Sequence, residues 1–456
     1  MTLWVPLLFW LAGLGGASEQ DRAQRYELGV TDLRDIYAET IKIGKGYYLL
    51  GYRKEAIYFL YRALELDPGN QGVLNDIALL EDFDNPFWKR KKWKSPKDDI
   101  AKAFEKDAKS FERALLKRYV EVAEKYRTGT GAILAKPEVA RGMLLTVLGR
   151  VGGPFEVDGE GALQLGAAGS LPADVSSWLL EEELATVDGQ IWFKDSVLRS
   201  LPDVAAVKEA RGKHFYVRVL GEKERAEELL EMMEQAYGQY AKHTKQEPIQ
   251  PMGLFVFPDK DSFQKYCDTV DLSGLKTALG FAKRNEGLAI SFEQAGLEQV
   301  CVHEGAHLFF RMAFAARMPS WYDEGFASFF GQDGTMTLER GKLKTGLPML
   351  QGRLSSALRA WIPQDEFLSA DAAGYAHDAS RGQTFYAQSW AYFTFLTTTR
   401  DRRFKKPFEE WESFCLGSSA GESYTKRSIA LFDRLFEEVR GELDEAVREW
   451  VADQVK

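Results

Sequence analysis

The stretch LEQVCVHEGAHLFFRM, residues 297 to 312, has the pattern of one apolar helix that displays two histidines. His303 and His307 are four residues apart, so on a helix their side chains project from the same face, one turn apart. The apolar flanks place this helix in a core, where two unpaired imidazoles would be costly. The stretch therefore predicts a buried functional site.

Two imidazoles at this spacing can reach one metal ion, and zinc accepts nitrogen ligands at about 2.0–2.1 Å. Glu304, next to the first histidine, can hold a zinc-bound water and accept its proton. Zinc lowers the pKa of such a water towards about 7 and polarises a scissile carbonyl. The chain has only 5 histidines, so this motif is rare by chance. We predict a hydrolytic Zn²⁺ site with His303 and His307 as ligands.

A catalytic zinc needs a third protein ligand and one open position. The nearest downstream acids are Asp323 and Glu324, in the segment PSWYDEGFAS, residues 319–328. Neighbours on a helix diverge by about 100°, so both cannot point at the metal. The small residues Gly325 and Ala327 would let the helix of Glu324 pack closely against the motif helix. We predict Glu324 as the third ligand and Asp323 as an exposed or capping residue.

Around the motif, short apolar runs alternate with helical patterns. We expect strands at 214–219, 252–257, 278–281 and 288–292, and helices at 222–240, 263–266, 297–312, 320–330, 386–397 and 429–451. A mixed sheet with helices after it is an α+β fold.

The chain before this region is helical from Asp32 to about Arg127. The spacing of Gly44, Ala56, Ala63 and Pro68 matches one tetratricopeptide repeat, in which small residues let two antiparallel helices approach. A solenoid needs about three repeats to bury a continuous core. We therefore favour a helical hairpin that packs on its neighbour over a peptide-binding groove. Residues 131–212 are rich in glycine and predict a small α/β or irregular segment.

The first residues predict export. Leu3 to Leu14 is an apolar run without a preceding Lys or Arg, and small residues at 15 and 17 come before a polar start. This pattern is typical of a signal peptide cleaved near Ala17, and the run is too short to span a bilayer. We expect a secreted or periplasmic protein with a signal peptide at 1–17, a helical region at 18–130, the small segment at 131–212 and the metal-site domain at 213–456.

Length, charge and cysteine spacing narrow the possible classes of protein. At 456 residues the chain is too long for one ordinary core. Its net charge of -9 argues against nucleic-acid binding, and no later segment is long enough for a stable membrane span. Cys267, Cys301 and Cys415 are far apart and form neither a thiolate zinc site nor a disulfide framework. The sequence leaves open whether two of these cysteines form a disulfide or all three are free thiols.

The pattern HExxH at 303–307, followed by WxxEGxA at 321–327, resembles the gluzincin metallopeptidases. Residues 323–328 resemble the third-ligand segment of aminopeptidase-N-like enzymes. Only sixteen residues separate His307 from Glu324, however, fewer than in those enzymes. Their Gly-x-Met-Glu-Asn tract, which holds a substrate's free amine, is not recognisable either.

A closer likeness is to the peptidase-MA-like family of bacterial secreted proteins, catalogued as a domain of unknown function. It runs from His214 to about Trp450 and includes LFVFP at 254–258, GF at 280–281 and YAQSW at 386–390. Such proteins often combine this domain with tetratricopeptide-type helices. The resemblance implies zinc, hydrolysis, and His303, His307 and Glu324 as ligands.

In gluzincins, a Tyr or His downstream of the third ligand stabilises the oxyanion formed by water attack. Tyr386 is the positional match, and Tyr375 and His377 are its rivals. The leading hypothesis is thus a zinc peptidase that cleaves a peptide or protein, with Glu304 as general base. One alternative is a catalytically inactive peptidase-like protein that binds partners through its tetratricopeptide-like helices. Another is zinc-dependent hydrolysis of a substrate other than a peptide.

Overall fold

The structure is a computed structural model, and the chain divides into two compact units, Met1–Ala206 and Val207–Lys456. The structure describes residues 34–66, 70–81, 98–129, 137–151, 154–165, 169–171, 173, 175–176, 183–245, 247–248, 251–283, 286–313, 318–370, 378–416 and 422–456. The expected signal peptide at 1–17 lies outside these residues, as do Tyr375 and His377.

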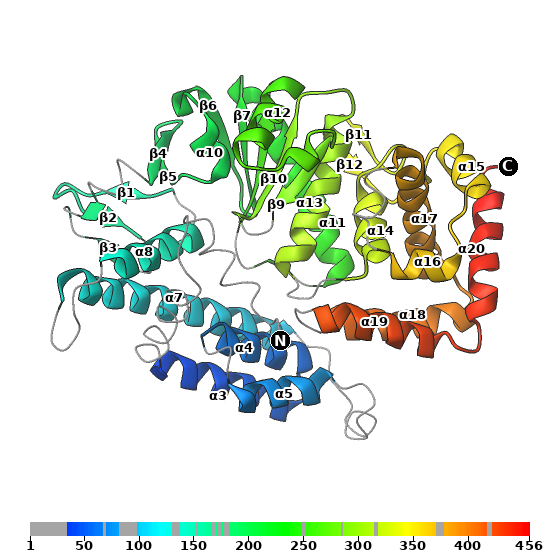
Figure 1. Ribbon diagram of the computed structural model, residues 1–456, viewed down its shortest axis with the longest axis horizontal. Coiled ribbons are helices and arrows are strands. Elements are labelled where there is room, and N and C mark those ends of the chain that lie inside the picture. Colours follow the sequence, from blue (N-terminus) through cyan, green and yellow to red (C-terminus); the bar gives the residue numbers. More distant parts are fainter. Residues whose placement is uncertain are drawn as a thin grey trace. The chain divides into compact units, whose positions relative to one another are not determined.

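The described part of the first unit begins with a helical hairpin of α3 (Arg34–Leu50) and α4 (Arg53–Leu66) (Figure 1). Gly44 makes their close approach possible, because a Cβ on it would lie only 3.2 Å from the Leu60 side chain. Ala56 and Ala63 of α4 are fully buried. Gly44 and Ala56 of the sequence pattern therefore lie where these helices pack, whereas Pro68 lies outside the described residues.

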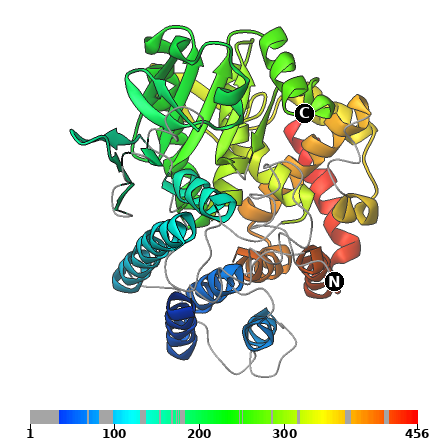
Figure 2. The same cartoon turned by 60° about the vertical axis from the view of Figure 1, so that its left-hand side comes forward.

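After this hairpin come the helices α5 (Gln71–Glu81), α7 (Asp98–Thr128) and α8 (Pro137–Val151). The two long ones, α7 and α8, lie side by side in both views (Figures 1 and 2). Short strands follow: β1 (Glu156–Val157), β2 (Leu163–Gln164) and β3 (Ser170–Leu171) form one antiparallel sheet, and β4 (Leu184–Val187) and β5 (Gln190–Phe193) form a hairpin. The unit ends with α10 (Ser196–Ser200) and the 3-10 turn η2 (Val204–Ala206).

The second unit is built on a five-stranded sheet with the order β6-β7-β8-β10-β9. Its central strands β7 (Phe215–Leu220), β8 (Met252–Phe257) and β10 (Leu288–Phe292) are parallel. The outer strands β6 (Val207–Arg211) and β9 (Gly280–Lys283) are antiparallel to their neighbours. All six residues of β8 are buried, as expected for a strand covered on both faces.

Helices cover both faces of this sheet. Successive residues of β9 point to opposite faces: Gly280 faces α13 (Leu297–Ala313), whereas the Phe281 ring contacts Phe263 of α12 (Lys260–Thr269). The long helix α11 (Lys223–Thr244) packs against α13, where the Tyr240 hydroxyl donates a hydrogen bond to the Val302 carbonyl at 2.6 Å. The helix that bears the histidines therefore lies on one face of the sheet, against β9 and β10, beside α11, which packs on β6 and β7.

The rest of the unit is mostly helical. After α14 (Ser320–Phe330) come the hairpin β11 (Thr337–Glu339) and β12 (Lys342–Lys344), then α15 (Gln351–Arg359), α16 (Gln364–Ser369), α17 (Ala379–Thr398), α18 (Arg402–Leu416), α19 (Glu422–Leu435) and α20 (Arg440–Gln454). Residues 387–396 of α17 are all buried, so this helix forms the centre of the helical layer. The short 3-10 turn η3 (Ser273–Leu275) precedes β9.

The sequence correctly predicts a mixed α and β architecture, and the structure changes several of its details. The helix expected at 386–397 begins earlier, at Ala379. The helical pattern at 429–451 is divided into α19 and α20 by a turn at residues 436–439, which begins at the buried Phe436. None of the described helices is long and apolar enough to cross a membrane.

Candidate metal centre

Two histidines of α13 meet at one point of the second unit. His303 and His307 lie one turn apart, and their Nε2 atoms are 3.2 Å from each other. Both side chains are largely buried, with 13% of His303 and 5% of His307 exposed. The spacing predicted from the sequence therefore places both imidazole nitrogens together inside the protein.

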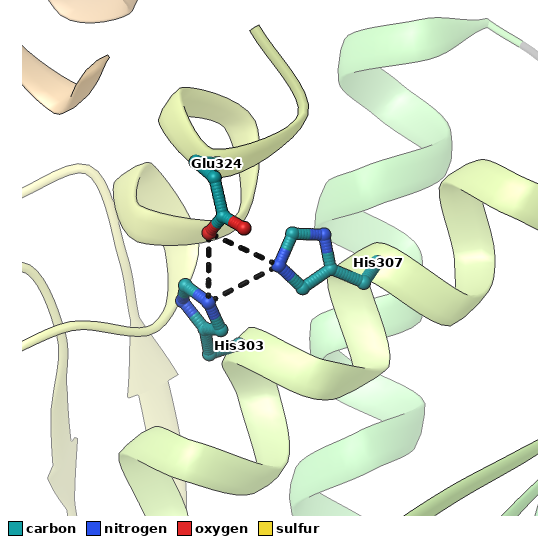
Figure 3. Close-up of side chains that lie close together, drawn as sticks. All are labelled: His303, His307 and Glu324. Carbon is teal, nitrogen blue, oxygen red and sulfur yellow. Dashed lines mark hydrogen bonds and ion pairs between the residues drawn. The ribbon is translucent and has the colours of Figure 1, made fainter. Parts of the chain in front are cut away.

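Glu324 reaches the same point from α14. Its Oε2 atom lies 3.5 Å from Nε2 of His303 and 3.3 Å from Nε2 of His307. Figure 3 shows the three side chains pointing toward one another, two from the motif helix and one from the next helix. The three candidate ligand atoms form a nearly equilateral triangle.

This triangle has the dimensions that a zinc site requires. Ligands placed tetrahedrally at about 2.0–2.1 Å from one ion are about 3.3–3.4 Å apart, and the three edges here measure 3.2, 3.3 and 3.5 Å. The Oε2 atom of Glu324 is buried, and none of the described residues hydrogen-bonds to it. A buried carboxylate oxygen that faces two imidazole nitrogens fits a shared cation.

The other ring nitrogen of each histidine is held by the protein. Nδ1 of His303 lies 3.1 Å from the carbonyl oxygen of Gly331, and Nδ1 of His307 lies 2.9 Å from Oδ1 of Asp323. With a proton on each Nδ1, both nitrogens donate to these oxygens, and both Nε2 atoms keep their lone pairs. Such outer contacts fix the tautomer and orientation of metal-binding histidines.

The prediction for Asp323 is wrong. It was expected to be exposed or capping, but only 18% of its side chain is exposed, and it contacts His307 and Arg311. The two neighbouring acids do diverge on α14, yet both meet the same imidazole, because a ring has nitrogens on two sides. The signal available in the sequence was the Asp-Glu pair itself, since metal-binding histidines regularly have a carboxylate partner.

The charges of this cluster support one another. Burial alone would lower the pKa of His307, but the charges of Asp323 and Glu324 outweigh it and raise that pKa well above its usual value. Burial would raise the pKa of Glu324, yet the charge of His307 lowers it to about 2. The pKa of Asp323 is likewise lowered against its burial, by the charges of His307 and Arg311. Both carboxylates are therefore ionised at neutral pH.

Glu304, the predicted general base, lies between the motif helix and the sheet. A Cβ atom on Gly280 of β9 would lie 3.2 Å from Cγ of Glu304, so the carboxylate arm passes directly over this strand. The side chain is partly exposed. Its negative charge acts on Arg311 and on Tyr386, whose pKa values it helps to raise. The predicted base thus lies close to the groups around the histidines.

Tyr386, the predicted oxyanion donor, is close to the same cluster. Its ring centroid lies 6.4 Å from that of His303. The charge of Glu324, followed by burial and the charge of Glu304, raises the pKa of Tyr386. The phenol therefore keeps its proton at neutral pH and can donate a hydrogen bond. Its rivals Tyr375 and His377 lie outside the described residues.

Glycines set the spacing of the helices that form the site. A Cβ on Gly331, at the end of α14, would lie 2.4 Å from the backbone nitrogen of His303. A Cβ on Gly325 would lie 2.6 Å from the carbonyl oxygen of Ser389 on α17. Gly325 therefore allows the close approach of α17 and not of the motif helix, contrary to the prediction. Gly331 allows α14 to approach α13.

The three cysteines take no part in this cluster. Cys267, Cys301 and Cys415 are buried, and no disulfide joins them. Burial raises the pKa of the Cys301 thiol, which keeps it protonated although it lies only two residues before His303.

A comparison with known proteins gives no match: neither a protein-family model nor a curated protein corresponds to this chain. The resemblance to the gluzincins stays a prediction from the motif residues.

Proposed function

We propose that the chain is a zinc-dependent hydrolase in which His303, His307 and Glu324 hold the metal. The observation that carries this proposal is the triangle of their ligand atoms, with edges of 3.2, 3.3 and 3.5 Å. Two imidazoles and one carboxylate leave a fourth position for water or substrate, the arrangement of catalytic and not structural zinc sites.

Bound zinc would supply Lewis acidity, lowering the pKa of a water and polarising the carbonyl under attack. Residues of the chain would transfer the proton, stabilise the oxyanion and orient the ligands. Glu304 accepts the proton of the attacking water and passes it to the leaving group. Tyr386 donates a hydrogen bond to the oxyanion, a role that fits its protonated state. Asp323 and Gly331 keep the two imidazoles in the orientation that ligation requires.

A peptide substrate is supported by the strand beside Glu304. In the described part of the sheet β9 ends the strand order, so its outer side has no strand partner. An extended peptide can pair with such an edge through its own backbone. The arm of Glu304 passes over Gly280 of this strand. We therefore infer that the enzyme is a peptidase whose substrate lies along β9.

Zinc content and one substitution test this function. Purified protein should contain about one zinc per chain. Glu304→Gln should retain the metal and lose hydrolysis of a peptide library, whereas Glu298→Gln on the same helix should keep both. Protein without zinc would refute the metal site. Zinc without cleavage of any peptide would favour a non-peptide substrate, or the inactive binding protein considered above.

We also propose that the protein is exported and that the hairpin of α3 and α4 belongs to a tetratricopeptide-like region able to bind a protein partner. The support is the N-terminal sequence pattern and the small residues at the α3–α4 contact. N-terminal sequencing of the mature protein should find a start near Ser18. A start at Met1 would contradict export by cleavage.

A further inference from the structure

The motif helix displays a third polar residue in line with the two histidines. His303, His307 and Arg311 follow one another at intervals of four residues, so all three lie on one face of α13. Arg311 is not needed to complete the triangle of candidate ligands. Its side chain is 38% exposed, yet its guanidinium has partners on two different elements.

Arg311 joins the surroundings of the metal centre to the edge of the sheet. Its Nη2 atom lies 3.4 Å from Oδ2 of Asp323, the carboxylate whose other oxygen meets Nδ1 of His307. Its Nη1 atom donates a hydrogen bond of 3.2 Å to the carbonyl oxygen of Ala282 on β9. A continuous path therefore runs from His307 through Asp323 and Arg311 to the edge strand.

Arginine suits this task because its planar guanidinium directs donors to two acceptors at once. Ala282 is two residues after Gly280, the position over which Glu304 passes, and both belong to β9. The single guanidinium thus ties the strand next to the proposed general base to the carboxylate that orients a candidate ligand.

We propose that Arg311 is a positioning residue that couples the metal centre to edge strand β9, so that metal binding orders the strand on which the substrate lies. This inference rests on the proposed function. In the metal-free protein the Asp323–Arg311 contact depends on where the His307 ring settles. A bound metal fixes this ring, and the fixed carboxylate then holds the guanidinium and, through it, the Ala282 carbonyl.

Arg225 provides a matched control. It lies on α11, is 30% exposed, and bridges Glu293 and Glu298 at 2.9 and 3.0 Å. It therefore also ties separate elements together through a guanidinium, but these two glutamates are neither candidate metal ligands nor residues of β9. Replacing it removes a structural clamp of the same kind and leaves the proposed path intact.

The test uses zinc alone, without substrate. The first measurement is the zinc dissociation constant, by competition with a chromophoric chelator. The second is hydrogen exchange of the β9 amides, residues 280–283, with and without zinc. In the wild type, zinc should slow this exchange. In Arg311→Met, zinc should bind about 3- to 10-fold more weakly, less than the 10- to 100-fold typical of a residue that touches the ligand itself. Zinc should also no longer protect β9.

The remaining variants separate the possible failures. Arg311→Lys keeps the charge but can reach only one acceptor well, so it should recover part of the affinity and little of the protection. Arg225→Met should lower the melting temperature and keep both zinc readouts. If Arg311→Met behaves like Arg225→Met in both zinc affinity and the protection of β9, the coupling is refuted, but the proposed metal site is not. If the wild type binds no zinc, or Glu324→Gln binds it equally well, the proposed function itself fails.

Discussion

Nδ1 of His307 lies 2.9 Å from Oδ1 of Asp323, and this contact turns the opposite nitrogen of the ring toward Glu324. Two neighbouring acids of α14 therefore act on the two sides of one imidazole. Asp323 orients the ring, and Glu324 completes the set of candidate ligand atoms. The difference in their positions leads to different expected effects when each is replaced.

Asp323→Asn should weaken zinc binding by about 10- to 100-fold, because the amide cannot stabilise the ring in the same way as an ionised carboxylate. Glu324→Gln should weaken it further, since this change alters a ligand. Competition with a chromophoric chelator measures both. Asp365→Asn is the control, because its side chain is 91% exposed and pairs only with Arg440 among the contacts described. Equal affinities for Asp323→Asn and the control would show that Asp323 has no orienting role.

Zinc binding should release protons near neutral pH. The pKa of His307 is raised well above its usual value, so the metal-free site holds a proton that zinc must displace. Zinc affinity should therefore rise by about tenfold per pH unit until the pH passes this pKa. Titration calorimetry in two buffers of different ionisation enthalpy measures the release. A binding enthalpy that is the same in both buffers would contradict it.

The same groups determine how the stability of the metal-free protein depends on pH. A raised pKa means that His307 stabilises the folded state fully below its unfolded pKa of about 6.5 and loses this effect as the pH rises through the folded value. Glu324, lowered to about 2, acts oppositely: its contribution is present above about pH 4.3 and is lost as the pH falls through its folded pKa. Metal-free protein should thus be most stable between these limits.

Local periodicity made the motif helices predictable. α14 has the predicted bounds, and α13 ends one residue after its predicted end. An apolar face that repeats every three to four residues defines a helix without reference to distant contacts. The placement of His303 and His307 follows from the same rule. The approach of Glu324 to both Nε2 atoms depends on how α13 and α14 pack. The sequence indicated only that neighbouring side chains on a helix diverge, so that Asp323 and Glu324 could not both point at the metal.

Features that depend on contacts between residues far apart in the chain could not be predicted from the sequence. β6 was missed because VKEAR, residues 207–211, contains three charged residues and has the pattern of a surface segment. In the structure Glu209 is buried and pairs with the equally buried Arg218 of β7 at 2.8 Å. Gly325 was assigned to the wrong neighbour for a similar reason, since α14 packs against both α13 and α17, and only the tertiary structure decides which helix a small residue faces.

Gly331→Ala should damage the site by a steric effect alone. The added Cβ would lie 2.4 Å from the His303 backbone nitrogen and 2.7 Å from the Gln299 carbonyl oxygen, so α14 must move away from α13. Overpacking of this kind costs about 1–3 kcal/mol of unfolding free energy, and the displacement of Glu324 should also weaken zinc binding. Chemical denaturation and chelator competition measure the two effects.

Gly238→Ala is the control for this change. It lies inside α11, where a Cβ would meet nothing within 4 Å. Alanine is the better helix former by about 0.5–1 kcal/mol, so this variant should be as stable as the wild type or more so. If Gly331→Ala also leaves stability and zinc affinity unchanged, the close contact between α14 and α13 is not required.

Tyr386→Phe separates catalysis from metal binding. The centroid of its ring lies 6.4 Å from that of His303, and the charge of Glu324, followed by burial, raises the pKa of its hydroxyl. Removing one oxyanion donor typically lowers kcat by about 100- to 1000-fold, whereas zinc content and the melting temperature should hardly change, because phenylalanine keeps the ring. Rates on a peptide identified from the library, measured together with zinc content, test this. Full activity in Tyr386→Phe would assign the donor to another residue, and loss of zinc would make Tyr386 part of the support of the site instead.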